Sequence, residues 1–161
     1  ILSGYSEHRL LMGMPIEAKL NGELKRAYPQ TRQVCLTNGG CSWLHAVVQI
    51  RKRREDDPKK IIKKTFETHR SLKMVTIVDE DIDPTSAESI EYAMATRFQA
   101  DHDLVIIKNV RGSSLDPSSD QKRLKTAKMG IDATKSFSKR KEGFEIAKIP
   151  SENKISLKDY F

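Results

Sequence analysis

KMVTIVD, residues 73–79, is the stretch of sequence that decides the fold. Its central residues are apolar or β-branched at consecutive positions, so an extended chain here would be apolar on both faces. A strand of this kind is typical of the middle of a parallel sheet, where helices cover both faces. The stretch therefore predicts an α/β fold with this strand at its centre.

Two further strand-like runs precede it, RQVCLT (residues 32–37) and SWLHAVVQI (residues 42–50). The NGG between them can supply the positive φ angles of a tight turn, so we expect an antiparallel hairpin. One face of the second run is wholly apolar and is the predicted core face: Leu44, Ala46, Val48 and Ile50.

Apolar residues at helical spacing predict three helices. The first begins near Pro15 and ends before Pro29, and the second covers about residues 61–72. The third follows DIDPTSAE (residues 81–88), where an Asp, Thr or Ser can cap the helix and the Pro suits its first turn. DLVIIKNV (residues 103–110) adds a last short strand.

The resulting order, α-β-β-α-β-α-β, predicts a layered mixed α/β sheet with two β-α-β crossovers and one antiparallel hairpin. Residues 15–118 form the predicted core, and residues 1–14 are an entry segment. Residues 119–161 are expected to be a basic loop and an extended C-terminal tail, because their apolar residues show little sustained period. KMGIDAT (residues 128–134) is expected to be a loop over the carboxyl edge of the sheet.

The composition permits an anionic partner without identifying one. The chain of 161 residues has 29 Lys and Arg against 22 Asp and Glu, a net charge of +7. Acids are mixed into the basic run at residues 51–64, which is typical of a solvated surface, and few aromatic residues accompany the basic runs, so nucleic acid binding is not favoured. The chain has only two cysteines, so we expect no disulfide framework. It has no apolar run long enough to span a membrane, and we expect a cytoplasmic protein.

No complete catalytic set is recognisable in the chain. Asp79 and Asp81 follow the central strand, at the edge where α/β sheets place ligands, and are weak candidates for Mg²⁺ ligands. A helix cap or a solvated turn is the favoured alternative. The four histidines lack partners at zinc-site spacing, and the glycine-rich phosphate loops and the GxSxG elbow are absent from the sequence.

The segments after the last predicted strand carry the candidates for a substrate cleft. Arg111 and Lys128 offer cations for a carboxylate or a phosphate. Gly130 would let the backbone approach a ligand or another chain closely, with Met129 and Asp132 beside it. The alternative is that Asp132 caps a turn and Lys128 lies in solvent.

Four stretches together resemble a known family. LTNGGCSWLHAVVQIRKR (residues 36–53), KMVTIVDEDIDPTSAESIEYAMATRF (73–98), DLVIIKNVRGSSLDP (103–117) and KMGIDAT (128–134) follow one another as in the carboxy-terminal domain of the UbiD-type decarboxylases, the 3-octaprenyl-4-hydroxybenzoate carboxy-lyase family. The resemblance extends over about residues 1–134 and is more specific than any single motif.

The resemblance implies a non-oxidative decarboxylase that uses prenylated FMN with a divalent metal and a monovalent cation. In the family an amino-terminal domain holds these groups and the catalytic Arg and two Glu, so no catalytic residue and no cofactor are expected in this chain. The opening ILSGYSEHRLLMGMPIEA (residues 1–18) resembles the stretch that joins that domain to the carboxy-terminal one. We therefore expect one domain of a longer enzyme, inactive alone.

By the same resemblance this domain would close over the flavin domain, form one wall of the substrate cleft and contribute to a homo-oligomer, with the tail reaching another subunit. The substrate would be an aromatic or α,β-unsaturated acid, such as 3-octaprenyl-4-hydroxybenzoate or anhydromevalonate phosphate, whose phosphate Arg111 or Lys128 could meet. Two alternatives stay open, a basic module that binds RNA or another polyanion and a purely structural assembly domain.

Overall fold

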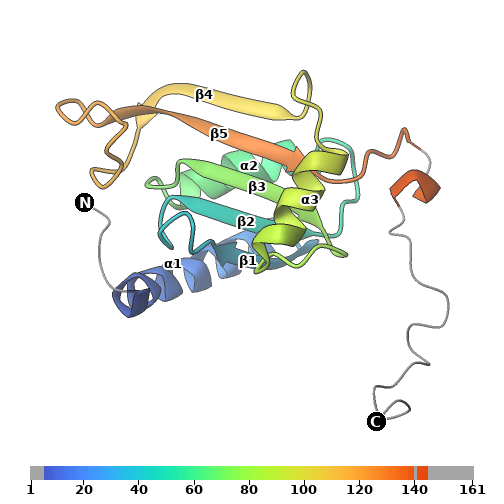
Figure 1. The fold of residues 1–161 in the computed structure, drawn as a ribbon, viewed down its shortest axis with the longest axis horizontal. Helices are drawn as coiled ribbons and strands as arrows, with labels where there is room; N and C mark the ends of the chain where they lie inside the picture. Colours follow the sequence, from blue (N-terminus) through green and yellow to red (C-terminus); the bar gives the residue numbers. More distant parts are fainter. Residues whose placement is uncertain (1–5, 140, 145–161) are drawn as a thin grey trace, which may run out of the picture.

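A computed structural model describes residues 6–139 and 141–144. A five-stranded sheet in the order β1-β2-β3-β5-β4 lies between helices on both of its faces (Figure 1). The layered mixed α/β architecture predicted from the sequence is confirmed. Its elements are α1 (Ser6–Ala27), β1 (Thr31–Leu36), β2 (His45–Ile50), α2 (Asp57–Thr68), β3 (Met74–Asp79), α3 (Ala87–Arg97), β4 (Leu104–Arg111), β5 (Lys125–Ala133) and the short 3-10 helix η1 (Lys141–Phe144).

The central strand of the sheet is β3, as its apolar sequence predicts. It runs parallel to β2 on one side and to β5 on the other. Val75 and Ile77 belong to a core cluster shared with α1 and α2, whereas Val78 belongs to a second cluster shared with α3. Helices on both sides of the sheet therefore bury both faces of β3.

The β1–β2 pair is antiparallel, as predicted, and Ala46, Val48 and Ile50 are fully buried on the predicted core face. The turn between these strands is wider than expected, because β2 begins only at His45. The positive φ angles, 58° and 52°, fall at Cys41 and Ser42 and not in the NGG stretch. Our prediction of a tight turn at NGG is therefore wrong.

Helix α1 begins well before the predicted start at Pro15. It begins at Ser6, so most of the predicted entry segment 1–14 is helical and Pro15 lies inside the helix. Gly13 allows α1 to lie close to the turn before β2, because a Cβ atom at this position would come within 2.9 Å of the Ser42 Cβ. No helix in the described part of the chain is long and apolar enough to span a membrane.

The KMGIDAT segment is not a loop. It forms most of β5, which lies between β3 and β4, parallel to the first and antiparallel to the second. The sequence predicts that the second β-α-β crossover connects β3 through α3 to a parallel strand at residues 103–110. That strand, β4, is antiparallel to β5, and it is β5 that pairs with β3 in parallel. The loop and tail predicted over residues 119–161 thus contain a strand, β5, and residues 140 and 145–161 of that stretch lie outside the described residues.

Candidate functional site at the carboxyl edge of the sheet

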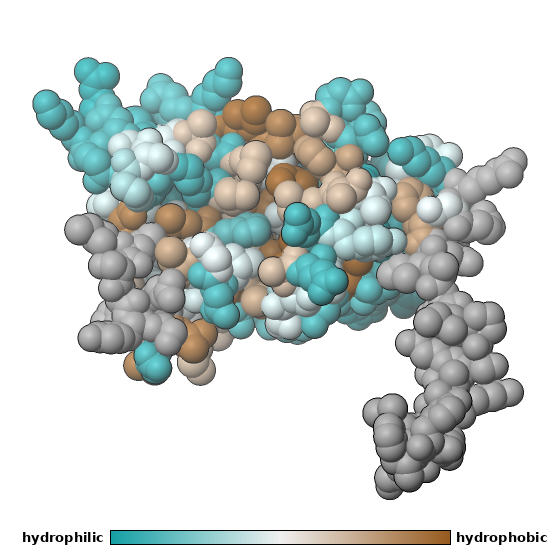
Figure 2. Space-filling model, viewed as in Figure 1, coloured by the Kyte–Doolittle hydropathy of each residue, from teal (hydrophilic) through white to brown (hydrophobic). Residues whose placement is uncertain are grey.

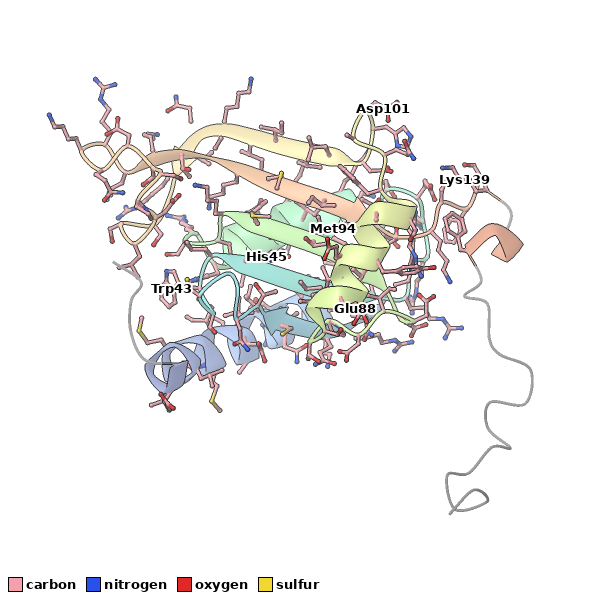
Figure 3. All side chains as sticks on the ribbon, in the orientation of Figure 1. Trp43, His45, Glu88, Met94, Asp101 and Lys139 are labelled. Carbon is pink, nitrogen blue, oxygen red and sulfur yellow. The ribbon has the colours of Figure 1, made fainter. Side chains whose placement is uncertain are left out.

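The parallel strands β2, β3 and β5 all end at the same edge of the sheet, and a cavity of about 470 Å³ lies there. Open α/β sheets commonly bind ligands at this edge. Charged residues from the strand ends line the cavity together with two phenylalanines: Arg51, Lys52, Asp79, Glu80, Asp81, Lys135, Phe137, Lys139 and Phe144. Figure 3 shows Lys139 beyond the end of β5, beside η1.

Arg97, the last residue of α3, joins two carboxylates at this edge. Its side chain is only 1% exposed. Its Nη1 donates to Asp79 Oδ2 at 3.0 Å and to Asp81 Oδ1 at 2.9 Å, and its Nη2 donates to Asp81 Oδ2 at 2.9 Å. The bidentate pair with Asp81 fixes the turn after β3 against the end of α3.

The two carboxylates respond differently to this arrangement. Partial burial opposes ionisation of Asp81, but the hydrogen bonds from Arg97 and Lys135 outweigh it and lower the Asp81 pKa to about 2. Burial dominates at Asp79 and raises its pKa, although the backbone N–H of Lys135 and the Arg97 charge act in the opposite direction. Asp79 is thus the carboxylate of this pair that is more readily protonated.

The geometry does not suit a metal ion at Asp79 and Asp81. Both carboxylates already accept hydrogen bonds from Arg97, and each accepts another from Lys135. Within residues 6–139 and 141–144, no group of three His, Cys, Asp or Glu side chains is placed to hold a metal ion. The two acids hold the fold together at the carboxyl edge of the sheet.

The segment that follows β5, residues 135–137, is tied across the ends of β2 and β3, and we call it the strap. The Lys135 N–H donates to Asp79 Oδ2 at 2.7 Å, and its Nζ donates to Asp81 Oδ2 at 2.7 Å. Lys52 Nζ donates to the Lys135 carbonyl at 3.1 Å. Glu55 accepts hydrogen bonds from the Ser136 hydroxyl and the Phe137 N–H. The strap therefore forms a fixed wall of the cavity.

Two of the predicted cleft residues, Arg111 and Lys128, lie near each other but at a different place. They line a second cavity of about 510 Å³ between α2 and the β4–β5 hairpin. Lys128 lies near the start of β5, and Lys135 follows its end. Seven residues of extended chain cover about 23 Å, so these two lysines cannot bind one small molecule together.

The remaining predicted residues of β5 have structural contacts. Asp132 is buried and accepts hydrogen bonds from the Thr134 N–H at 3.0 Å and hydroxyl at 2.6 Å, and burial raises its pKa. Gly130 faces Ile62 of α2, and Met129 packs against the core cluster on the α3 side. The close approach that Gly130 permits is thus to a helix of the same domain.

Sequence reasoning missed Lys52, Arg97, Lys135 and Phe137. Arg97 lies 18 residues from Asp79, so no local pattern links the two side chains. Lys135 directly follows KMGIDAT, and it would have been found if that stretch had been recognised as a strand that ends at the ligand-binding edge.

The histidines near the sheet are packed residues. The two ring nitrogens of His45 lie 3.2 Å from Thr37 Oγ1 and 3.0 Å from Thr76 Oγ1, and burial lowers its pKa to about 4. The ring of His69 meets the ring of Trp43 edge to face, with centroids 4.9 Å apart. Figure 3 shows His45 at the start of β2. Both rings serve the packing of this end of the sheet.

Comparisons with known proteins agree with the fold and the motifs. The family model for the 3-octaprenyl-4-hydroxybenzoate carboxy-lyase C-terminal domain matches residues 9–133. Anhydromevalonate phosphate decarboxylase from Methanocaldococcus jannaschii is 52% identical over 150 residues, which are 93% of this chain and 36% of that protein. The enzyme of the same name from Aeropyrum pernix is 47% identical over 93% of this chain and 34% of its own length. This chain thus spans about a third of these relatives.

Solved structures show the same relationship. The UbiD-class enzyme HmfF from Pelotomaculum thermopropionicum, in complex with FMN, superposes with a TM-score of 0.89 and 41% identity over 96% of this chain and 34% of its own. The 3,4-dihydroxybenzoic acid decarboxylase AroY from Klebsiella pneumoniae superposes with a TM-score of 0.82 and 28% identity, over 96% of this chain and 34% of its own. The chain belongs to the UbiD family of carboxy-lyases, of which it contains the carboxy-terminal domain.

Proposed function

We propose that this chain is the carboxy-terminal part of a non-oxidative decarboxylase that acts on anhydromevalonate phosphate. The observation that carries the proposal is the pattern of identities. Relatives of that name are 46% to 52% identical to this chain, whereas a gallate decarboxylase is 32% identical. An acid that carries a phosphate is therefore a better candidate substrate than a polyprenyl hydroxybenzoate.

The cofactor of the complete enzyme would be prenylated FMN, since solved relatives hold FMN or prenylated FMN. It would supply the electron sink for the carbanion-like centre that forms when CO₂ leaves. We assign the flavin, a divalent metal and a monovalent cation to a domain upstream of this chain. In this assignment the described residues supply shape and charge, and the upstream domain supplies the reacting groups.

The carboxyl-edge cavity is our candidate for the wall of the substrate cleft. Four cations line this cavity: Arg51, Lys52, Lys135 and Lys139. Of these, Lys135 and Lys139 follow β5 in the chain. The Lys135 side chain is 33% exposed, so its Nζ could contact an anion while it keeps its bond to Asp81. A wall that excludes water would strengthen the attraction of these cations for a phosphate or carboxylate.

The test uses a longer chain in which this domain follows its flavin-binding part, loaded with prenylated FMN. We expect CO₂ release from anhydromevalonate phosphate, and we expect Lys135→Ala to raise KM by about tenfold, the loss of about 1.4 kcal/mol of binding. Lys122→Ala removes an equal charge from the exposed β4–β5 connection and should leave KM unchanged. Turnover of gallate without turnover of anhydromevalonate phosphate would overturn the substrate assignment.

Two other functions were open from the sequence, and family membership favours the decarboxylase over both. An RNA-binding module would retain single-stranded or duplex RNA, with affinity that falls steeply as salt rises. An assembly domain would govern subunit number, and one solved relative is an evolved dimeric form. We propose that the complete enzyme is a homo-oligomer, and light scattering of the longer chain with and without residues 145–161 would test the contribution of the tail.

A further inference from the structure

A second cavity, which we call the α2 groove, lies between α2 and the β4–β5 hairpin and has a volume of about 510 Å³. Phe66, Ile107 and Val110 give it an apolar lining. Four cations and one acid complete the lining and give it a formal charge of +3: Lys63, Arg70, Arg111, Lys128 and Glu67. An apolar surface with an excess of positive charge is complementary to an anion that has an apolar body.

Lys128 is the cation held most firmly in the groove. It is 4% exposed, and its Nζ donates to the carbonyl of Arg70 at 2.6 Å. The same Nζ lies 5.2 Å from the centroid of the Phe66 ring, within the range of a cation–π contact. An ammonium group has three N–H donors, and the Arg70 carbonyl uses one of them. Two donors remain for a ligand.

The placement of Lys128 costs stability unless an anion compensates for it. Burial lowers its pKa to about 8, and the neighbouring Arg70 charge acts in the same direction. A methionine at this position would fill similar space without a charge. A buried cation next to Arg70, in a cavity that Arg111 also lines, is therefore better explained by a bound anion than by packing.

We propose that the α2 groove binds a small organic phosphate with an apolar tail, whose phosphate contacts Lys128 and Arg111 and whose tail lies on Phe66, Ile107 and Val110. A volume of about 510 Å³ falls within the range of small-molecule sites. Both parts of the ligand contribute, so neither inorganic phosphate nor the corresponding alcohol should bind as tightly as the alkyl phosphate.

The experiment titrates the 161-residue chain with octyl phosphate below its micelle concentration, followed by calorimetry and by amide NMR shifts. We expect saturable binding with shifts in α2, β4 and the start of β5. Lys128→Met and Arg111→Ala should each weaken binding by about tenfold, whereas Glu67→Gln should strengthen it. Lys108→Ala removes an exposed charge from β4 outside the groove and should bind as the unchanged chain does.

Other ligands separate the possible outcomes. Octanol and inorganic phosphate should each bind at least about tenfold more weakly than octyl phosphate. Equal binding of octanol, or unchanged binding by both the Lys128→Met and Arg111→Ala variants, would overturn the proposal. Retention on phosphatidic acid vesicles without binding of octyl phosphate would overturn it too, in favour of a lipid surface. These measurements need no flavin and no turnover, so their failure would leave the decarboxylase proposal untouched.

Discussion

Gly130 determines how closely α2 can pack on the sheet. A Cβ atom at this position would overlap the Ile62 Cγ2 and lie 3.0 Å from its Cδ1. Ile62 is fully buried, so it has little room to move. We predict that Gly130→Ala lowers the free energy of unfolding by about 1–3 kcal/mol, because it overpacks the contact between α2 and β5. Urea unfolding of the 161-residue chain measures the loss.

Gly39 supplies the matched control for this change. It lies in the exposed turn before β2, and a Cβ atom there would have no neighbour within 4 Å. Gly39→Ala should therefore change the free energy of unfolding by no more than about 0.5 kcal/mol. Equal effects of the two substitutions would show that the Gly130 contact with Ile62 does not limit packing.

Lys128 should make stability depend on pH in the alkaline range. Its pKa in the folded chain is lowered to about 8 from 10.5, so between these values the unfolded chain binds more protons than the folded one. The free energy of unfolding therefore rises with pH across this window. We predict that Lys128→Met stabilises the chain by up to about 3 kcal/mol at pH 7, and that its advantage shrinks as the pH approaches 10.5.

Unfolding by urea at pH 7 and pH 10 checks this dependence. Lys108→Met removes a lysine that is exposed on β4, so its effect on stability should be small and nearly the same at both pH values. An Lys128→Met variant that is less stable than the unchanged chain at pH 7 would mean that the bond to the Arg70 carbonyl outweighs the cost of burial.

Among the elements, those with a regular apolar pattern could be predicted from the sequence. The strands β1 and β3 and the helices α2 and α3 lie close to where the pattern indicates them. Strand β5 could not be predicted in this way, because Lys128, Gly130 and Asp132 interrupt its apolar pattern. Each residue makes a contact that the local pattern does not show. Lys128 donates to the Arg70 carbonyl just after α2, Gly130 lies close to Ile62 of α2, and Asp132 forms a hydrogen-bonded turn with Thr134.

The start of α1 and the site at the carboxyl edge depend on similar long-range effects. In the sequence Pro15 indicates the first turn of a helix, yet α1 begins at Ser6 and continues through Pro15. The earlier part of α1 packs at Gly13 against the turn before β2. The sequence does indicate correctly that Asp79 and Asp81 lie at the carboxyl end of the central strand, where Asp79 is its last residue. It cannot show that Arg97 and Lys135 neutralise them, since these partners come from two other elements.

Arg97 at the end of α3 pairs with Asp79 and Asp81, and we call this group the clamp. It should be the strongest of the ion pairs described at this edge. We predict that Arg97→Met lowers the free energy of unfolding by about 3–5 kcal/mol, because it removes the guanidinium that pairs with both partly buried carboxylates and leaves only Lys135 beside Asp81. Because Asp79 also accepts the Lys135 N–H, we expect faster hydrogen exchange in the strap. Urea unfolding and exchange measured residue by residue test both effects.

Arg26 is the matched control for this substitution. It pairs with Glu23 on the surface of α1, and its side chain is 75% exposed. Arg26→Met should cost less than about 1 kcal/mol, as surface ion pairs usually do. If Arg97→Met lowered the free energy of unfolding by a similarly small amount, water would be solvating Asp79 and Asp81 well enough to replace Arg97. The strap would then not depend on the clamp.

At the scale of the whole molecule, apolar surface gathers at the start of α1. Leu10, Leu11 and Met14 are 48%, 71% and 64% exposed. Figure 2 shows apolar atoms at this end of α1 and along β4. The chain spans about a third of its relatives. We propose that it is part of a longer protein, in which a flavin-binding part covers the start of α1.

This proposal predicts different results for the short and the longer chain. The double substitution Leu11→Gln and Met14→Gln removes apolar area that is exposed in the 161-residue chain, so its free energy of unfolding should change by no more than about 0.5 kcal/mol. In the longer chain the same change removes a buried contact, and we expect a loss of about 2 kcal/mol and reduced turnover. Ala18→Gln, at another exposed position of α1, should affect neither chain. Equal losses in the two chains would place these side chains within the fold of this domain, and no loss in either would leave the start of α1 in solvent.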